Sequence, residues 1–83
     1  MDLQNLGARI CYVRKYRGFK GVDLANKIGI DQSYLSKIEK GKHLPNLRIL
    51  CSISSALDCS LDYLCGNEAY SYYVPTLEDE EDK

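Results

Sequence analysis

The side chains with the clearest chemical potential in this sequence lie in residues 32–40, QSYLSKIEK. Leu35 and Ile38 are about one turn apart, so a helix over this segment would turn both toward a core. The outward side would then carry Gln32, Ser33, Ser36 and Lys37. Glutamine can pair with the N6 and N7 edge of adenine, lysine with O6 and N7 of guanine, and serine with a base or a phosphate. These four residues are therefore candidate DNA base contacts, and the alternative is a polar helix face that meets only solvent.

Two short helices joined at Gly29 must position this face. Apolar residues recur at helical spacing on both sides of the glycine, at Leu24, Ile28, Leu35 and Ile38. Gly29 can take a positive φ without a Cβ clash, so it ends the first helix and turns the chain. Ala25 leaves room for a close helix crossing. Asp31 is expected to cap the second helix by accepting from the amide of Ser33 or Tyr34.

Three further helices complete the predicted fold. One spans residues 6–17 and precedes the helix-turn-helix, with Asn5 as its cap. The next has Asn46 as its cap. It carries Leu47, Leu50, Ile53 and Leu57 over the core and ends at Asp58. A short last helix is capped by Ser60 and ends at Gly66. The sequence therefore predicts a compact, all-α, five-helix domain over residues 1–66.

The ordered set of small, charged and apolar residues resembles the helix-turn-helix of the lambda-like phage repressor and Cro family of transcriptional regulators. The matching positions are Leu24, Ala25, Ile28, Gly29, Ile30, Leu35, Ile38 and Glu39, followed by Gly41, Pro45, Leu50, Leu57, Leu61 and Leu64. An unrelated helical bundle would explain the leucines but not the glycines, Glu39 or Pro45. The resemblance runs from about Leu6 to Gly66 and implies a lambda-repressor-like DNA-binding domain.

The resemblance also implies roles for residues around the candidate reading helix. Lys40, Lys42 and His43 follow that helix in the loop where the family contacts the DNA backbone, and Tyr34 lies at the edge of the same face. Phosphate contacts of this kind position a helix without specifying a sequence. Arg14 and Glu39 occupy positions where the family has a partly buried ion pair, which is expected to hold the first and third helices together.

Lys20 and Gly21 are where this chain departs from the family pattern. The family usually has a Ser or Thr cap followed by a Gln that holds a phosphate and braces the first base contact. Neither residue here can replace those side chains. Lys20 can still reach a phosphate, and Gly21 can offer its backbone amide at a helix amino terminus. Both are therefore kept as candidate phosphate contacts.

The net charge of −1 conceals two parts of opposite sign. Residues 1–66 carry ten Lys and Arg against six Asp and Glu, a net of +4, whereas residues 67–83 carry one Lys against six acids, a net of −5. A basic helical domain can bind a phosphate backbone, and an acidic segment on the same chain would weaken that attraction.

The segment over residues 67–83 is rich in tyrosine and then acidic. Tyr70, Tyr72 and Tyr73 have strand-like composition, and a lone strand gains partners only through association. Together with Tyr63 they are candidate dimer contacts. The alternatives are that Tyr63 belongs to the core and that the segment is a disordered tail.

The remaining composition argues against catalysis and metal binding. The four cysteines, Cys11, Cys51, Cys59 and Cys65, form no CxxC pair, and the single histidine cannot complete a usual zinc set. Cys59 is expected in the core, whereas Cys11 and Cys51 are expected on exposed faces. No nucleophile partner for His43 and no phosphate-binding glycine loop is evident. No cofactor is implied, and the absence of a signal-peptide pattern predicts a cytoplasmic protein.

These features predict a non-enzymatic, sequence-specific regulator of transcription that binds double-stranded DNA as a homodimer on a two-fold-symmetric operator. An alternative is a protein-interaction module or antitoxin that keeps the helix-turn-helix only as a scaffold. A redox role for an exposed cysteine is a remote third reading.

Overall fold

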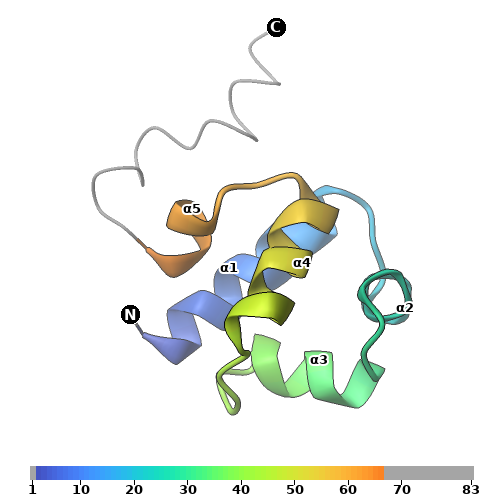
Figure 1. Ribbon diagram of the computed structural model, residues 1–83, viewed down its shortest axis with the longest axis horizontal. Helices are drawn as coiled ribbons and strands as arrows, with labels where there is room; N and C mark the ends of the chain where they lie inside the picture. The colour runs from blue at the N-terminus through green and yellow to red at the C-terminus, as the bar shows by residue number, and fades with distance from the viewer. Residues whose placement is uncertain (1, 67–83) are drawn as a thin grey trace, which may run out of the picture.

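Five helices follow one another in the computed structural model, which describes residues 2–66 (Figure 1). They are α1 (Leu3–Tyr16), α2 (Gly21–Ile28), α3 (Gln32–Glu39), α4 (Leu47–Leu57) and α5 (Leu61–Cys65). The predicted all-α, five-helix architecture is confirmed. The predicted Tyr-rich and acidic segment, with Tyr70, Tyr72 and Tyr73, lies outside the described residues.

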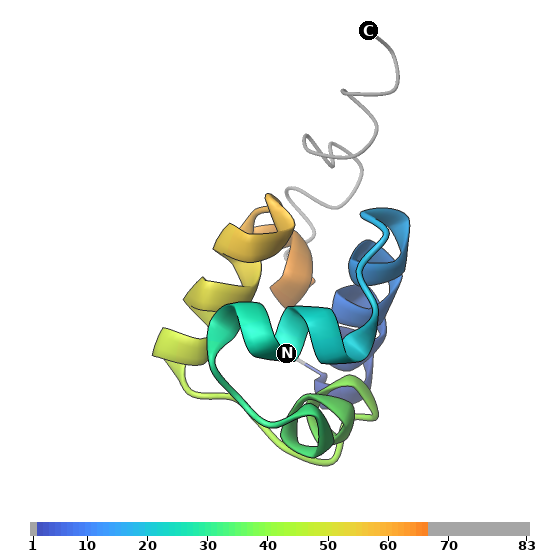
Figure 2. The same ribbon diagram turned by 90° about the vertical axis from the view of Figure 1, so that its right-hand side faces the viewer.

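The helices pack so that α3 is held from two sides. It contacts α1 and α2, while α4 packs on α2 and α5 packs on α1 and α4. Figure 2 shows α2 lying across the molecule, with α3 below it and nearly perpendicular to it. The turn between α2 and α3 contains Gly29, whose φ of 79° is left-handed and whose N–H donates to the Ala25 carbonyl. This is the helix-turn-helix geometry that the sequence predicts.

Every helix contributes to one apolar core. Its buried residues include Leu6, Ile10, Val13, Leu24, Ala25, Leu35, Ile38, Leu50, Ile53, Leu57, Cys59 and Leu64. The prediction for Leu47 is wrong, because its side chain is 69% exposed. Leu47 is the first residue of α4, and at this end of the helix its side chain lies beyond the edge of the core. Ile28 is half-buried at the end of α2 and packs against the core from the side.

Several helix ends form as the sequence predicts. Asn46 accepts from the Ile49 amide at 2.8 Å, and Ser60 accepts from the Tyr63 amide at 3.0 Å. Asp58 ends α4 with a left-handed φ of 53°. Each of these caps depends on residues within one turn of chain, which is why local sequence is sufficient to identify them.

The predicted amino ends of two helices need correction. The α1 helix begins at Leu3 rather than at Leu6, and its cap is Asp2, which accepts from the Gln4 amide at 2.9 Å. The earlier start is favoured because it also packs Leu3 against the core. Asp31 occupies the cap position of α3 but makes no capping hydrogen bond. Since Asp31 is exposed, water can hydrogen-bond to its carboxylate instead.

The cysteines lie in different environments. Cys59 is buried and Cys51 is exposed, as expected, whereas Cys11 is half-buried with its Sγ 3.7 Å from Arg14 Nη2. The prediction that Cys11 is exposed is therefore wrong, since Cys11 lies one turn before Arg14 on α1 and its thiol contacts the guanidinium.

Among residues 2–66, no helix has the length and apolar character needed to cross a bilayer.

Cys59 should make the stability of the protein fall at high pH. Burial raises the pKa of its thiol from 9.0 to about 11. Above pH 9 the unfolded chain loses this proton while the folded chain keeps it, so the free energy of unfolding should fall between pH 9 and 11, by about 2 kcal/mol from this group. Urea unfolding at several pH values measures the slope. Cys59→Ala should flatten it, and equal slopes in both proteins would contradict the assignment.

Candidate nucleic-acid interface

The α3 helix presents the predicted base-contacting side chains on the side opposite its core residues. Leu35 and Ile38 are buried, whereas Gln32, Ser33 and Lys37 are exposed. Ser36 is half-buried, so it lies at the margin of this face. We call these four polar residues the α3 face. Because both buried anchors are on one side of a short helix, the α3 face is held in a fixed direction relative to the core.

Gln32 lies beside the amino terminus of α2. A Cβ added at Gly21 would sit 3.6 Å from Gln32 Nε2, which is ordinary contact distance. Arg14, Gly21, Gln32, Leu35, Ser36 and Glu39 line a recess of about 170 Å³ at this point. The sequence predicts Gly21 as a backbone phosphate contact that lacks the glutamine side chain usual in the family. In the structure, the bare backbone of Gly21 leaves space next to the first residue of the α3 face.

Asp23 is a site residue that the sequence analysis missed. Its carboxylate accepts from the backbone N–H of Lys20 at 3.2 Å, at the amino end of α2. The Lys20 side chain makes no capping hydrogen bond, as expected for a group that only donates. An acidic residue three positions into a helix is a known capping signal, so Asp23 could have been found from the sequence. The Lys20 side chain is exposed and free to face an anion.

The loop after α3 is held against both α3 and α1. The rings of Tyr34 and His43 meet edge to face with centroids 4.8 Å apart. The amide of Lys42 donates to the Lys37 carbonyl at 2.9 Å. Gly41 has a φ of 76°, and a Cβ there would lie 2.9 Å from Gln4 Cα. The exposed side chains of Lys40, Lys42 and His43 are therefore positioned next to the α3 face.

Arg14 and Glu39 form an ion pair with two hydrogen bonds beneath the α3 face. Arg14 Nε lies 2.7 Å from Glu39 Oε2, and Nη2 lies 3.0 Å from Oε1. Arg14 Nη1 also donates to the Phe19 carbonyl at 2.9 Å. The hydrogen bond to Glu39 is the main cause of a raised pKa for Arg14, which keeps the guanidinium charged. The pair joins α1, the turn before α2 and the last residue of α3.

The other predicted contact residues lie elsewhere. Tyr63 is half-buried and packs against the core at α5.

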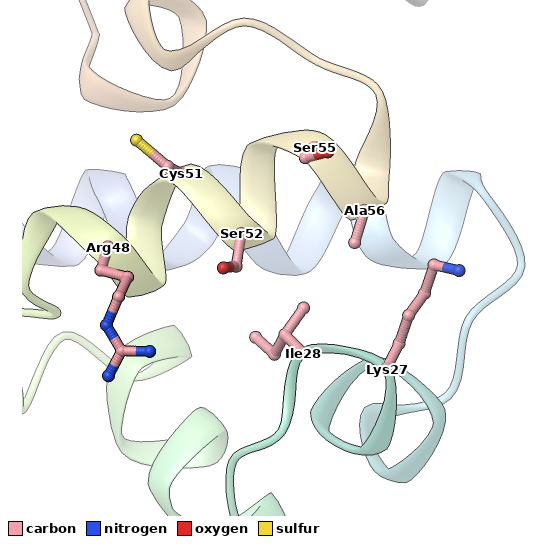
Figure 3. A pocket seen from close by; sticks show the side chains of 7 residues that line it. All are labelled: Lys27, Ile28, Arg48, Cys51, Ser52, Ser55 and Ala56. Carbon is pink, nitrogen blue, oxygen red and sulfur yellow. The ribbon is translucent and has the colours of Figure 1, made fainter.

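A separate hollow of about 680 Å³ lies between α2 and α4, lined by Lys27, Ile28, Arg48, Cys51, Ser52, Ser55 and Ala56 (Figure 3). Ile28 and Ser52 point toward each other across it, whereas Cys51 points away from α2. None of the predicted DNA contacts lines this hollow.

The α2 and α3 helices meet at the turn that contains Gly29, and α3 directs its polar face away from the shared core. This arrangement defines a helix-turn-helix protein. A comparison with known families matches residues 12–64 to the family described as Helix-turn-helix. The chain belongs to this family, and its resemblance to lambda-like phage repressors is confirmed.

Individual relatives agree with the family match. The chain is 34% identical to the HTH-type transcriptional regulator SinR of Bacillus subtilis over 79 residues, which cover 94% of this chain and 71% of that protein. The controller protein C.AhdI of Aeromonas hydrophila superposes with a TM-score of 0.72 at 30% identity, covering 76% of this chain and 96% of C.AhdI. The P22 c2 repressor, solved with a synthetic operator, superposes with a TM-score of 0.70 at 34% identity, covering 74% and 92%.

Proposed function

We propose that this protein is a sequence-specific, DNA-binding regulator of transcription that places α3 in the major groove. The observation that carries this proposal is the α3 face, which is polar, exposed and fixed to the core by Leu35 and Ile38. Its family membership supports the same function, since SinR is a transcriptional regulator and the P22 c2 repressor was solved with an operator. A helix of this size fits the width of the major groove.

The residues divide into two roles in this proposal. Gln32, Ser33, Ser36 and Lys37 read base edges. Lys20, Tyr34, Lys40, Lys42 and His43, with the backbone amide of Gly21, hold phosphates on either side. The contact between Tyr34 and His43 supports the second role, because it ties the loop to the helix that it must position.

A homodimer on a two-fold-symmetric operator is the assembly that we propose. Two short recognition helices spaced by one turn of DNA read more bases than a single α3 can reach. We place the DNA-binding domain at residues 1–66 and leave Tyr63, Tyr70, Tyr72 and Tyr73 as proposed dimer contacts. In this proposal the protein has no catalytic role and works in the cytoplasm, where its DNA partner would be found.

Gln32→Ala and Lys37→Ala should each relax the preference for the selected DNA sequence while leaving the fold intact. A bidentate base contact provides about 1 to 3 kcal/mol of discrimination, so affinity for the selected site should fall about tenfold more than affinity for random duplex. The measurement is titration of both DNAs, after selection of a bound sequence from a random pool.

Lys27→Ala is the matched control, because Lys27 is an exposed lysine of the same motif that lines the hollow between α2 and α4. It should leave the specificity ratio unchanged. A salt series on random duplex should also give a linear loss of log affinity with log salt concentration. Equal losses on both DNAs for Gln32→Ala and Lys37→Ala would contradict the base-reading roles.

A further inference from the structure

Four exposed lysines gather around the α3 face. Lys20 precedes α2, Lys37 is on α3, and Lys40 and Lys42 are in the following loop. Within residues 2–66 none of these four side chains forms an ion pair, whereas Arg14 is paired with Glu39. The exposed carboxylates Asp23 and Asp31 lie at the amino ends of α2 and α3 without pairing with these lysines, so four lysines against two aspartates leave a surplus of positive charge on this side.

The last described residue, Gly66, and the basic loop after α3 both contact α1. A Cβ added at Gly66 would lie 2.8 Å from Arg9 Nη1, and one added at Gly41 would lie 2.9 Å from Gln4 Cα. Gln4 and Arg9 are both on α1, five residues apart, which is about 7.5 Å along the helix axis. Five residues also turn the helix by about 140°, so the end of α5 and the basic loop contact α1 at different places around its axis.

The segment that follows has the length and the charge to cover these lysines. Residues 67–83 carry six acids, five of them consecutive at positions 78–82. Eleven residues lie between Gly66 and Glu78, and the twelve steps that join these two residues reach about 40 Å in an extended chain. The described domain measures 34 × 25 × 19 Å, so the acidic run can reach the α3 face without difficulty.

The hollow between α2 and α4 is the weaker docking surface for the same acidic run. Its lining contains two cations, Lys27 and Arg48, against four around the α3 face. The larger number of lysines therefore favours the α3 face.

We propose that the acidic run of residues 78–82 binds the lysines around the α3 face of its own chain and competes there with DNA. The competition rests on the proposed function, whereas the contact itself does not. Tethering raises the effective concentration of the run to about millimolar, so weak ion pairs are sufficient for binding. Salt should release the contact, because the pairs are exposed and screened.

Carbodiimide crosslinking of the full chain without DNA tests the contact directly. The reagent joins a carboxylate to an amine as an amide only when the two groups touch. In the monomeric species at low salt, mass spectrometry should find residues 78–82 joined mainly to Lys20, Lys37, Lys40 and Lys42. Lys15 and Lys27 are the internal controls, since both are exposed lysines outside this group. Crosslinks spread evenly over all exposed lysines, or found only between chains, would overturn the proposal.

A neutral variant tests the consequence for DNA. Replacing Glu78, Asp79, Glu80, Glu81 and Asp82 by Gln or Asn should raise affinity for random duplex about tenfold at low salt, as expected for the loss of a few exposed ion pairs. Added duplex should also suppress the crosslinks in the native chain. Crosslinks that persist at saturating duplex, or an unchanged affinity, would overturn the competition. A chain that forms the crosslinks but binds no DNA would instead overturn the proposed function.

Discussion

Replacing Gly7 by alanine is expected to lower the melting temperature by about 15 °C, because a methyl group at this position has no room. A Cβ at Gly7 would overlap the backbone carbonyl oxygens of Ile38 and Glu39 and lie 2.7 Å from the Glu39 carbonyl carbon. Backbone atoms cannot rotate away as a side chain can. The α1 and α3 helices would have to separate, which would also stretch the ion pair between Arg14 and Glu39.

Gly21→Ala is the control for Gly7→Ala, since it adds the same methyl group to another helix. A Cβ at Gly21 makes only ordinary contact with Gln32, at 3.6 Å from Nε2. Its effect on stability should stay within about 1 kcal/mol, with the helix propensity of alanine in its favour. Thermal unfolding followed by circular dichroism compares the two variants. Similar melting temperatures for both would show that the contact between α1 and α3 is not close.

Glu39→Ala is expected to reduce the free energy of unfolding by about 3 kcal/mol. The substitution leaves the Arg14 guanidinium without its counter-charge, and the two side chains are only 12% and 11% exposed. Loss of one partner removes two short hydrogen bonds and leaves a charge that water reaches poorly. Chemical denaturation measures the change.

Two further variants separate this explanation from a general effect of changing α3. Asp31→Ala removes the exposed carboxylate at the cap position before α3, which makes no capping hydrogen bond, so it should cost less than about 1 kcal/mol. The double variant Arg14→Met with Glu39→Met should recover part of the loss, because no unpaired charge remains. A double variant less stable than Glu39→Ala would mean that Arg14 stabilises the fold without Glu39.

Sequence alone was sufficient for several features that depend on residues within a turn or two of one another. The turn at Gly29 and the caps at Asn46 and Ser60 follow from local chain chemistry, and the buried positions of α2 and α3 follow from helical period. The capping predictions at Asn5 and Asp31 were wrong for different reasons, because α1 begins earlier with Asp2 as its cap, whereas Asp31 is at the cap position of α3 without a capping hydrogen bond. Tertiary contact of Leu3 favoured the earlier start of α1.

The sequence by itself determined which segments are helices, where they turn and which polar side chains share the outward side of α3. Only the tertiary structure decided how closely α1 approaches α3 at Gly7 and that Leu47 lies outside the core. It also decided that the Gln32 side chain lies next to the backbone of Gly21. Helical period sets the direction of a side chain around its own axis. The distance and angle between two axes depend instead on how residues far apart in the chain pack together, and no local pattern contains that information.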